Sequence, residues 1–110
     1  MIKLLLLEDD HVLAESLIEL LQSENFDIVH VVNSQEALNQ TFLQNFDLFL
    51  LDVNVPLFNG FELLKNLRDS GDKTPAIFLT ALNDIASLSK GFDVGADDYI
   101  KKPFDFDELI

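Results

Sequence analysis

The feature of this sequence that most constrains its fold is a regular alternation between two apolar patterns. Short runs that are apolar at nearly every position recur along the chain, and segments with apolar residues at helical spacing separate them. The runs lie at residues 2–7, 28–32, 48–51, 76–79 and, more weakly, 99–100. Runs of this length that are apolar on both faces are typical of parallel strands covered on both sides by helices.

Four intervening segments carry apolar residues three and four positions apart, which predicts helices with one buried face. These apolar stripes are Val12, Leu13, Leu17, Leu20 and Leu21; Ala37, Leu38, Phe42 and Leu43; Phe61, Leu63, Leu64 and Leu67; and Ile85, Leu88 and Phe92. Asn33 followed by Glu36 indicates a capped start of the second helix. The strand–helix alternation implies right-handed crossovers and a doubly wound α/β fold with a parallel sheet.

The chain has 110 residues, enough for one domain with a single core, so we expect one domain over residues 1–110. Asp105 and Glu108 indicate the start of a fifth helix, but the sequence ends at Ile110. One helical turn is not stable by itself, since isolated helices shorter than about 12 residues are marginal. We therefore expect this helix to be incomplete and the chain to be part of a longer protein.

The composition is strongly acidic, with 20 Asp and Glu against 7 Lys and Arg and a formal net charge of -13. Such a chain is repelled by nucleic-acid phosphates and by anionic membranes, so we expect no direct contact with either. The sequence has no cysteine, which excludes disulfides and thiolate metal sites. No apolar run approaches the roughly 18 residues of a membrane-spanning helix, and we expect a cytoplasmic protein.

Acidic residues gather where two predicted strands end. Glu8, Asp9 and Asp10 follow the first apolar run, and Asp52 ends the third. Ligands of open α/β sheets bind at the carboxyl ends of the strands. Because we expect the first and third strands to be neighbours, Glu8, Asp9 and Asp52 should meet there. Clustered carboxylates repel one another unless a cation lies among them, and this all-oxygen set suits Mg²⁺ better than Ca²⁺. The alternative is that Asp9 and Asp10 only cap the first helix.

Two further polar residues follow the later strands. Thr80 ends the fourth apolar run, and Lys102 precedes Pro103 after the fifth. Taken singly, each residue has another explanation: Asp52 could be a turn-forming residue, and Lys102 could be a lysine exposed to solvent. Together they indicate a Mg²⁺-assisted phosphoryl site, in which a carboxylate attacks phosphorus while the metal and the ammonium group neutralise phosphoryl oxygens. Thr80 would donate its hydroxyl to one of those oxygens.

Four motifs follow in order along the chain: EDD at residues 8–10, DVNVPLFNG at 52–60, FLTA at 78–81 and GADDYIKKPF at 95–104. This set resembles the receiver domain of two-component response regulators over the whole chain. The last motif is especially similar to receivers of OmpR/PhoB-type transcription factors, which carry a winged-helix DNA-binding domain beyond the receiver. The resemblance implies a flavodoxin-like or CheY-like sheet of five parallel strands in the order 2-1-3-4-5, and a DNA-binding output domain in the longer protein.

The resemblance also implies a role for each acidic residue. Asp52 would be the phosphoacceptor. Asp9 would be a direct Mg²⁺ ligand together with Asp52 and the backbone carbonyl of Asn54. Glu8 would act largely through a water molecule bound to the metal, and Asp10 would serve as a helix cap.

By the same resemblance, the domain is a switch rather than a dedicated enzyme. A sensor histidine kinase, or a small donor such as acetyl phosphate, would transfer a phosphoryl group to Asp52. Lys102 and Thr80 would then engage the phosphoryl group, and Tyr99 would form a switch pair with Thr80. The face made by the fourth helix, fifth strand and fifth helix would shift and bind a partner or form a homodimer.

Two other function classes fit less well. A phosphohydrolase of haloacid-dehalogenase type needs a second Asp two positions after its nucleophile, where this chain has Asn54. An interaction module that has lost phosphorylation would not be expected to keep the acids together with Thr80 and Lys102. His11 and His30 have no His or Cys partner at ligand spacing, so we expect both to be structural. We also expect the phenylalanines to lie in the core.

Overall fold

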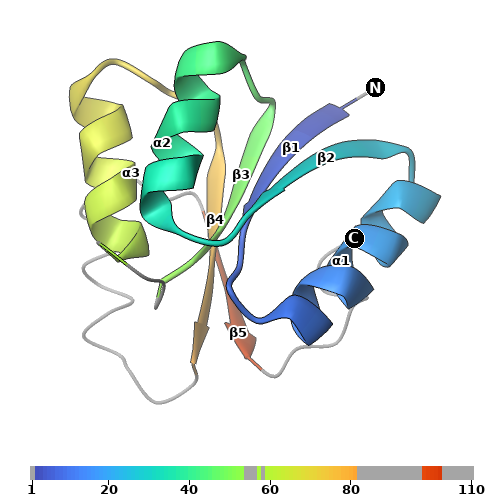
Figure 1. The fold of residues 1–110 in the computed structure, drawn as a ribbon. Helices are drawn as coiled ribbons and strands as arrows, with labels where there is room; N and C mark the ends of the chain where they lie inside the picture. The colour runs from blue at the N-terminus through green and yellow to red at the C-terminus, as the bar shows by residue number, and fades with distance from the viewer. Residues whose placement is uncertain (1, 54–56, 58, 82–97, 103–110) are drawn as a thin grey trace.

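The structure, a computed structural model, describes residues 2–53, 57, 59–81 and 98–102 (Figure 1). Its elements, in chain order, are β1 (Ile2–Leu7), α1 (His11–Ser23), β2 (Phe26–Val31), α2 (Ser34–Leu43), β3 (Leu48–Asp52), α3 (Gly60–Asp69), β4 (Ala76–Ala81) and β5 (Asp98–Lys102). The predicted fourth and fifth helices lie outside the described residues.

The strands form one sheet in the order β2-β1-β3-β4-β5, and each neighbouring pair is parallel. This confirms the predicted doubly wound parallel sheet and its strand order. In the pairing of β1 with β3, Leu7 lies opposite Leu51. Glu8 and Asp52, the residues that follow this pair, are therefore delivered to the same edge of the sheet.

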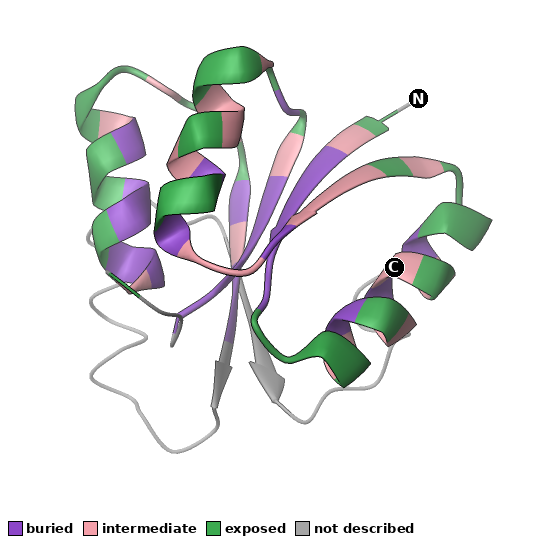
Figure 2. Ribbon diagram, viewed as in Figure 1, coloured by how far each residue is buried: buried purple, intermediate pink, exposed green. Residues whose placement is uncertain are grey.

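Helices cover both faces of the sheet, with α2 and α3 on one side and α1 on the other (Figure 1). Strand β1 serves both layers because successive side chains of a strand point to opposite faces. Leu5 and Leu7 belong to the cluster that includes residues of α2 and α3, whereas Leu4 and Leu6 pack with residues of α1. Figure 2 shows the buried positions of α1 and α3 on the sides that face the sheet.

Each described helix begins with a side chain that caps its backbone N–H groups. The Asp10 carboxylate accepts hydrogen bonds from the N–H groups of Val12 and Leu13. Asn33 Oδ1 accepts one from Glu36 N–H at 2.8 Å, and its Nδ2 donates to the Glu36 carboxylate at 2.9 Å. The predicted capped start of the second helix and the capping role of Asp10 are thereby confirmed.

The expected burial of two helical stripes is wrong at particular positions. Phe42 and Leu43 are 86% and 75% exposed, and Val12 is 77% exposed. Val12 is the second residue of α1, and the buried side of this helix is formed instead by Ala14, Leu17 and Leu21. At the far end of α2 the core is filled instead by Phe46, whose ring lies 6.2 Å from that of Phe49. Phe42 lines a groove between α2 and α3 rather than the sheet.

Among the described residues, no helix is long and apolar enough to cross a membrane.

Candidate metal and phosphoryl site

Glu8 is the first residue after β1, and its backbone continues the pairing with β2. Its N–H donates to the Val31 carbonyl at 3.1 Å. The Glu8 side chain is completely buried, and its carboxylate accepts a hydrogen bond of 3.3 Å from the N–H of Asp10. The neighbouring Asp9 is exposed. One acid at this strand end therefore faces the interior and the next faces solvent.

Asp52 ends β3, the strand in the middle of the sheet, and is 6% exposed. The start of α3 passes close behind it, since the Gly60 N–H donates to the Val53 carbonyl at 2.9 Å. A Cβ at position 60 would collide with the backbone carbonyl of Asp52 and lie 3.2 Å from the Phe78 ring. Glycine at this position thus permits the approach of α3 to the strand end that carries Asp52.

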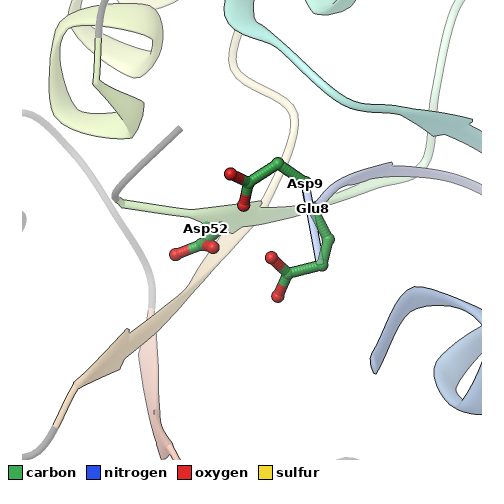
Figure 3. Close-up of side chains that lie close together, drawn as sticks. All are labelled: Glu8, Asp9 and Asp52. Carbon is green, nitrogen blue, oxygen red and sulfur yellow. The ribbon is translucent and has the colours of Figure 1, made fainter. Parts of the chain in front are cut away.

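The carboxylates of Glu8, Asp9 and Asp52 converge where β1 and β3 end (Figure 3). One oxygen from each lies within 4.8 Å of the others. Oxygens on opposite sides of one Mg²⁺ are about 4.2 Å apart, because each Mg²⁺–O distance is about 2.1 Å. The oxygens of the cluster, all within 4.8 Å of one another, can therefore approach a common ion with little movement. The donor set therefore fits a hard divalent cation, as the sequence predicts, and exposed Asp9 keeps one side accessible.

The backbone register brings the later strands to the same edge. Asp52 pairs with Leu79, so Thr80 is the next residue of β4 beyond the level of Asp52. Thr80 in turn pairs with Lys101, which places Lys102 one residue further along β5. Tyr99 pairs with Phe78, deeper in the sheet. Asn54, the predicted source of a backbone ligand, lies outside the described residues.

Two contacts of His30 at the site were not predicted from the sequence. His30 Nε2 lies 2.8 Å from the backbone carbonyl oxygen of Glu8. The His30 ring also meets the edge of the His11 ring, with centroids 6.4 Å apart. Residue spacing contains no sign of these contacts. They follow from the register of β1 and β2, which pairs Leu6 with His30.

Comparison with known proteins shows the family. Residues 4–110 match the family model described as the response regulator receiver domain. This chain is a response regulator receiver domain. Receiver domains are signalling modules that take a phosphoryl group from histidine kinases and bind Mg²⁺ at an acidic pocket. The acidic cluster of this receiver domain is formed by Glu8, Asp9 and Asp52.

The similar curated proteins include transcriptional regulators. The receiver domain is 46% identical over 108 residues to the transcriptional regulatory protein CrdR of Helicobacter pylori, covering 97% of this chain and 51% of the relative. It is 40% identical over 108 residues to the cell cycle response regulator CtrA of Brucella ovis, covering 98% and 47%. The chain thus spans about half the length of these relatives.

Solved structures agree with this assignment. The receiver domain of the Francisella response regulator 1452 superposes with a TM-score of 0.94 at 34% sequence identity. The match covers 100% of this chain and 91% of that one. The similarity therefore extends over the whole fold, and includes the strand ends that carry the acidic cluster.

Proposed function

We propose that this receiver domain is a Mg²⁺-dependent switch that accepts a phosphoryl group on Asp52. The observation that carries the proposal is the convergence of Asp52 with Glu8 and Asp9, whose oxygens lie within 4.8 Å of one another. Asp52 is also the acid that ends the central strand: it pairs with Leu79 of β4 and directly follows Leu51, which pairs with Leu7 of β1. A rigidly held carboxylate beside a cation site is suited to nucleophilic attack on phosphorus.

In the proposed reaction, a carboxylate oxygen of Asp52 attacks the phosphorus atom of a phosphohistidine on a sensor histidine kinase. The new O–P bond forms as the P–N bond breaks, and the histidine of the kinase leaves with the bonding electron pair. Asp9, Asp52 and the Asn54 carbonyl would hold Mg²⁺, with Glu8 beside them. When bound, the ion would neutralise the negative charge that develops on the phosphoryl oxygens during the transfer.

The residues that follow the later strands complete the proposed switch. The Lys102 ammonium group pairs with a phosphoryl oxygen, and the Thr80 hydroxyl donates a hydrogen bond to another. Movement of Thr80 toward the phosphoryl group opens space for the ring of Tyr99. This local change biases an existing equilibrium between two arrangements of the domain. The backbone register, which brings these residues toward the edge that carries Asp52, supports this assignment.

The proposed output is control of transcription by a longer cytoplasmic protein. The chain spans about half of CrdR and CtrA, which are named as a transcriptional regulatory protein and a response regulator. We propose that a DNA-binding domain follows this receiver and that phosphorylation favours a homodimer through the fourth helix, β5 and the fifth helix. The net charge of -13 supports a receiver that does not itself contact nucleic acid or membranes. In this role the domain is a phosphoacceptor and not a dedicated enzyme.

The proposal is tested by intact mass spectrometry after incubation with acetyl phosphate, with and without Mg²⁺. Wild type should gain one phosphoryl group only when Mg²⁺ is present, and Asp52→Asn should gain none. Asp27→Asn, which removes an exposed acid of β2, is the matched control and should behave as wild type. Phosphorylation of Asp52→Asn to the wild-type level would contradict the proposal. If wild type gains nothing, Mg²⁺-dependent binding of beryllofluoride would indicate a receiver that accepts only its own kinase, and absence of binding would contradict the proposal.

A further inference from the structure

His30 contacts the acidic cluster through the backbone without being one of its acids. The residue lies in β2 next to Val31, and its Nε2 is 2.8 Å from the carbonyl oxygen of Glu8. The N–H of Glu8 donates to the Val31 carbonyl at 3.1 Å. Strand β2 therefore holds both backbone polar groups of Glu8, one through its main chain and the other through the His30 side chain.

The chemistry of the two partners fixes the direction of this hydrogen bond. A carbonyl oxygen only accepts, so the His30 ring must carry a hydrogen on Nε2 and donate it. The ring is partly buried, and its edge contact with His11 reaches the first residue of α1. The His30 side chain thus touches both ends of the connection between β1 and α1, the segment that supplies Glu8 and Asp9.

The Glu8 carbonyl belongs to the planar peptide group that joins Glu8 to Asp9. Holding that carbonyl restrains this peptide plane, which precedes the Asp9 Cα. Together with the Glu8 N–H bond to Val31, it restrains both peptide planes that flank the Glu8 Cα. We infer that His30 is a positioning residue for the acidic cluster, orienting two of its three carboxylates. The inference rests on the proposed Mg²⁺ site and adds a residue that the receiver motifs in this sequence do not include.

The need for such a restraint follows from the charges. Glu8, Asp9 and Asp52 repel one another, and residues 8–10 belong to no helix or strand that would hold them against that repulsion. The Glu8 N–H bond to Val31 and the Asp10 cap of α1 hold the two ends of this connection. Removing the His30 hydrogen bond takes away the restraint on the peptide group between Glu8 and Asp9, so that exposed Asp9 can shift away from Asp52. Residues that orient metal ligands typically change metal affinity by about 10–100-fold when they are replaced.

The test is a Mg²⁺ titration of the phosphate-free protein, followed by two-dimensional ¹H–¹⁵N NMR. His30→Phe keeps a ring but removes the donor, and it should weaken Mg²⁺ binding by about tenfold. His30→Gln places an amide N–H where the ring Nε2–H lies, and it should restore affinity to within about twofold of wild type. His11→Phe keeps the ring contact and is the matched control, with affinity expected within about twofold of wild type.

A second measurement reads the hydrogen bond directly. Long-range ¹H–¹⁵N correlation spectra of the metal-free wild type should show the His30 ring protonated at Nε2. A ring protonated only at Nδ1 would overturn the inference, as would equal Mg²⁺ affinity of folded His30→Phe and wild type. If His30→Phe does not fold, His30→Asn replaces it, because its shorter amide ends near the position of Nδ1. Absence of Mg²⁺ binding by wild type would instead overturn the proposed site, and this inference with it.

Discussion

At the scale of single residues, Gly60 lies where the backbone leaves no room for a Cβ atom. A Cβ there would collide with the Asp52 carbonyl oxygen. Gly60→Ala should therefore lower the free energy of unfolding by about 1–3 kcal/mol, measured by urea denaturation, because α3 or the end of β3 must shift. It should also weaken Mg²⁺ binding, since that shift moves Asp52.

Gly71→Ala is the matched control for this prediction. A Cβ at position 71 meets nothing within 4 Å, but the backbone φ there is +94°, so the change should cost stability through strain alone. Its Mg²⁺ affinity should equal that of wild type. Equal Mg²⁺ affinity of Gly60→Ala and Gly71→Ala would contradict the proposed coupling between position 60 and Asp52.

Leu57 has a left-handed backbone, with φ +79°, and its side chain is 73% exposed. The left-handed conformation costs an L-residue about 1–2 kcal/mol, and replacement by glycine removes this strain. Glycine also has more conformational entropy in the unfolded chain, which cancels about 0.5–1 kcal/mol of the gain in stability. Leu57→Gly should therefore raise the free energy of unfolding by roughly 0.5–1 kcal/mol in urea denaturation. A lower stability than wild type would show that the exposed side chain makes a contact worth more than the strain.

At the scale of helices and strands, the exposed end of α2 leads to a prediction about packing. Phe42→Ala should lower the free energy of unfolding by less than about 0.5 kcal/mol, since the ring is already in water. Phe49→Ala, at a core position of β3, should cost about 3–5 kcal/mol. Chemical denaturation of both variants checks the contrast, and a similar loss for Phe42→Ala would show that its ring packs against the protein.

Apolar patterns in the sequence predicted some of these elements accurately and others only in part. The run at residues 2–7 coincides with β1 because that strand is covered on both faces and is apolar almost throughout. Strand β2 begins two residues before its predicted start, because an edge strand tolerates polar residues such as Asp27. Helical spacing indicated the buried side of α2, but it contains no information on where the sheet beneath the helix ends. Phe42 was therefore wrongly assigned to the core.

In the candidate site, the acidic residues could be predicted from the sequence, whereas the contact of His30 could not. Glu8, Asp9 and Asp52 were predictable because they stand at strand ends, and parallel strands bring those ends to one edge. The contact of His30 with the Glu8 carbonyl was not predictable, because it depends on the residue-by-residue register of β1 with β2. Hydrogen bonds from side chain to backbone across a sheet have no characteristic spacing in the sequence.

At the scale of the whole molecule, the acidic cluster should couple metal binding to stability. A ligand that binds only the folded state raises the free energy of unfolding by about 2.7 kcal/mol when its concentration is 100 times its dissociation constant. Mg²⁺ should therefore raise the thermal midpoint of wild type, and Asp9→Asn should lose most of this rise. NaCl at equal ionic strength separates the effect from general screening of the net charge of -13. An equal rise in NaCl, or in Asp9→Asn, would contradict a specific site.

The central claim is that Asp52 is the phosphoacceptor, and locating the acyl phosphate tests it most directly. Wild type is incubated with acetyl phosphate and Mg²⁺, reduced with borohydride to convert an aspartyl phosphate into homoserine, and mapped by peptide mass spectrometry. We expect homoserine at position 52, and none there when Mg²⁺ is omitted. Reduction at Asp9, Asp10 or another acid, with residue 52 still aspartate, would contradict the claim.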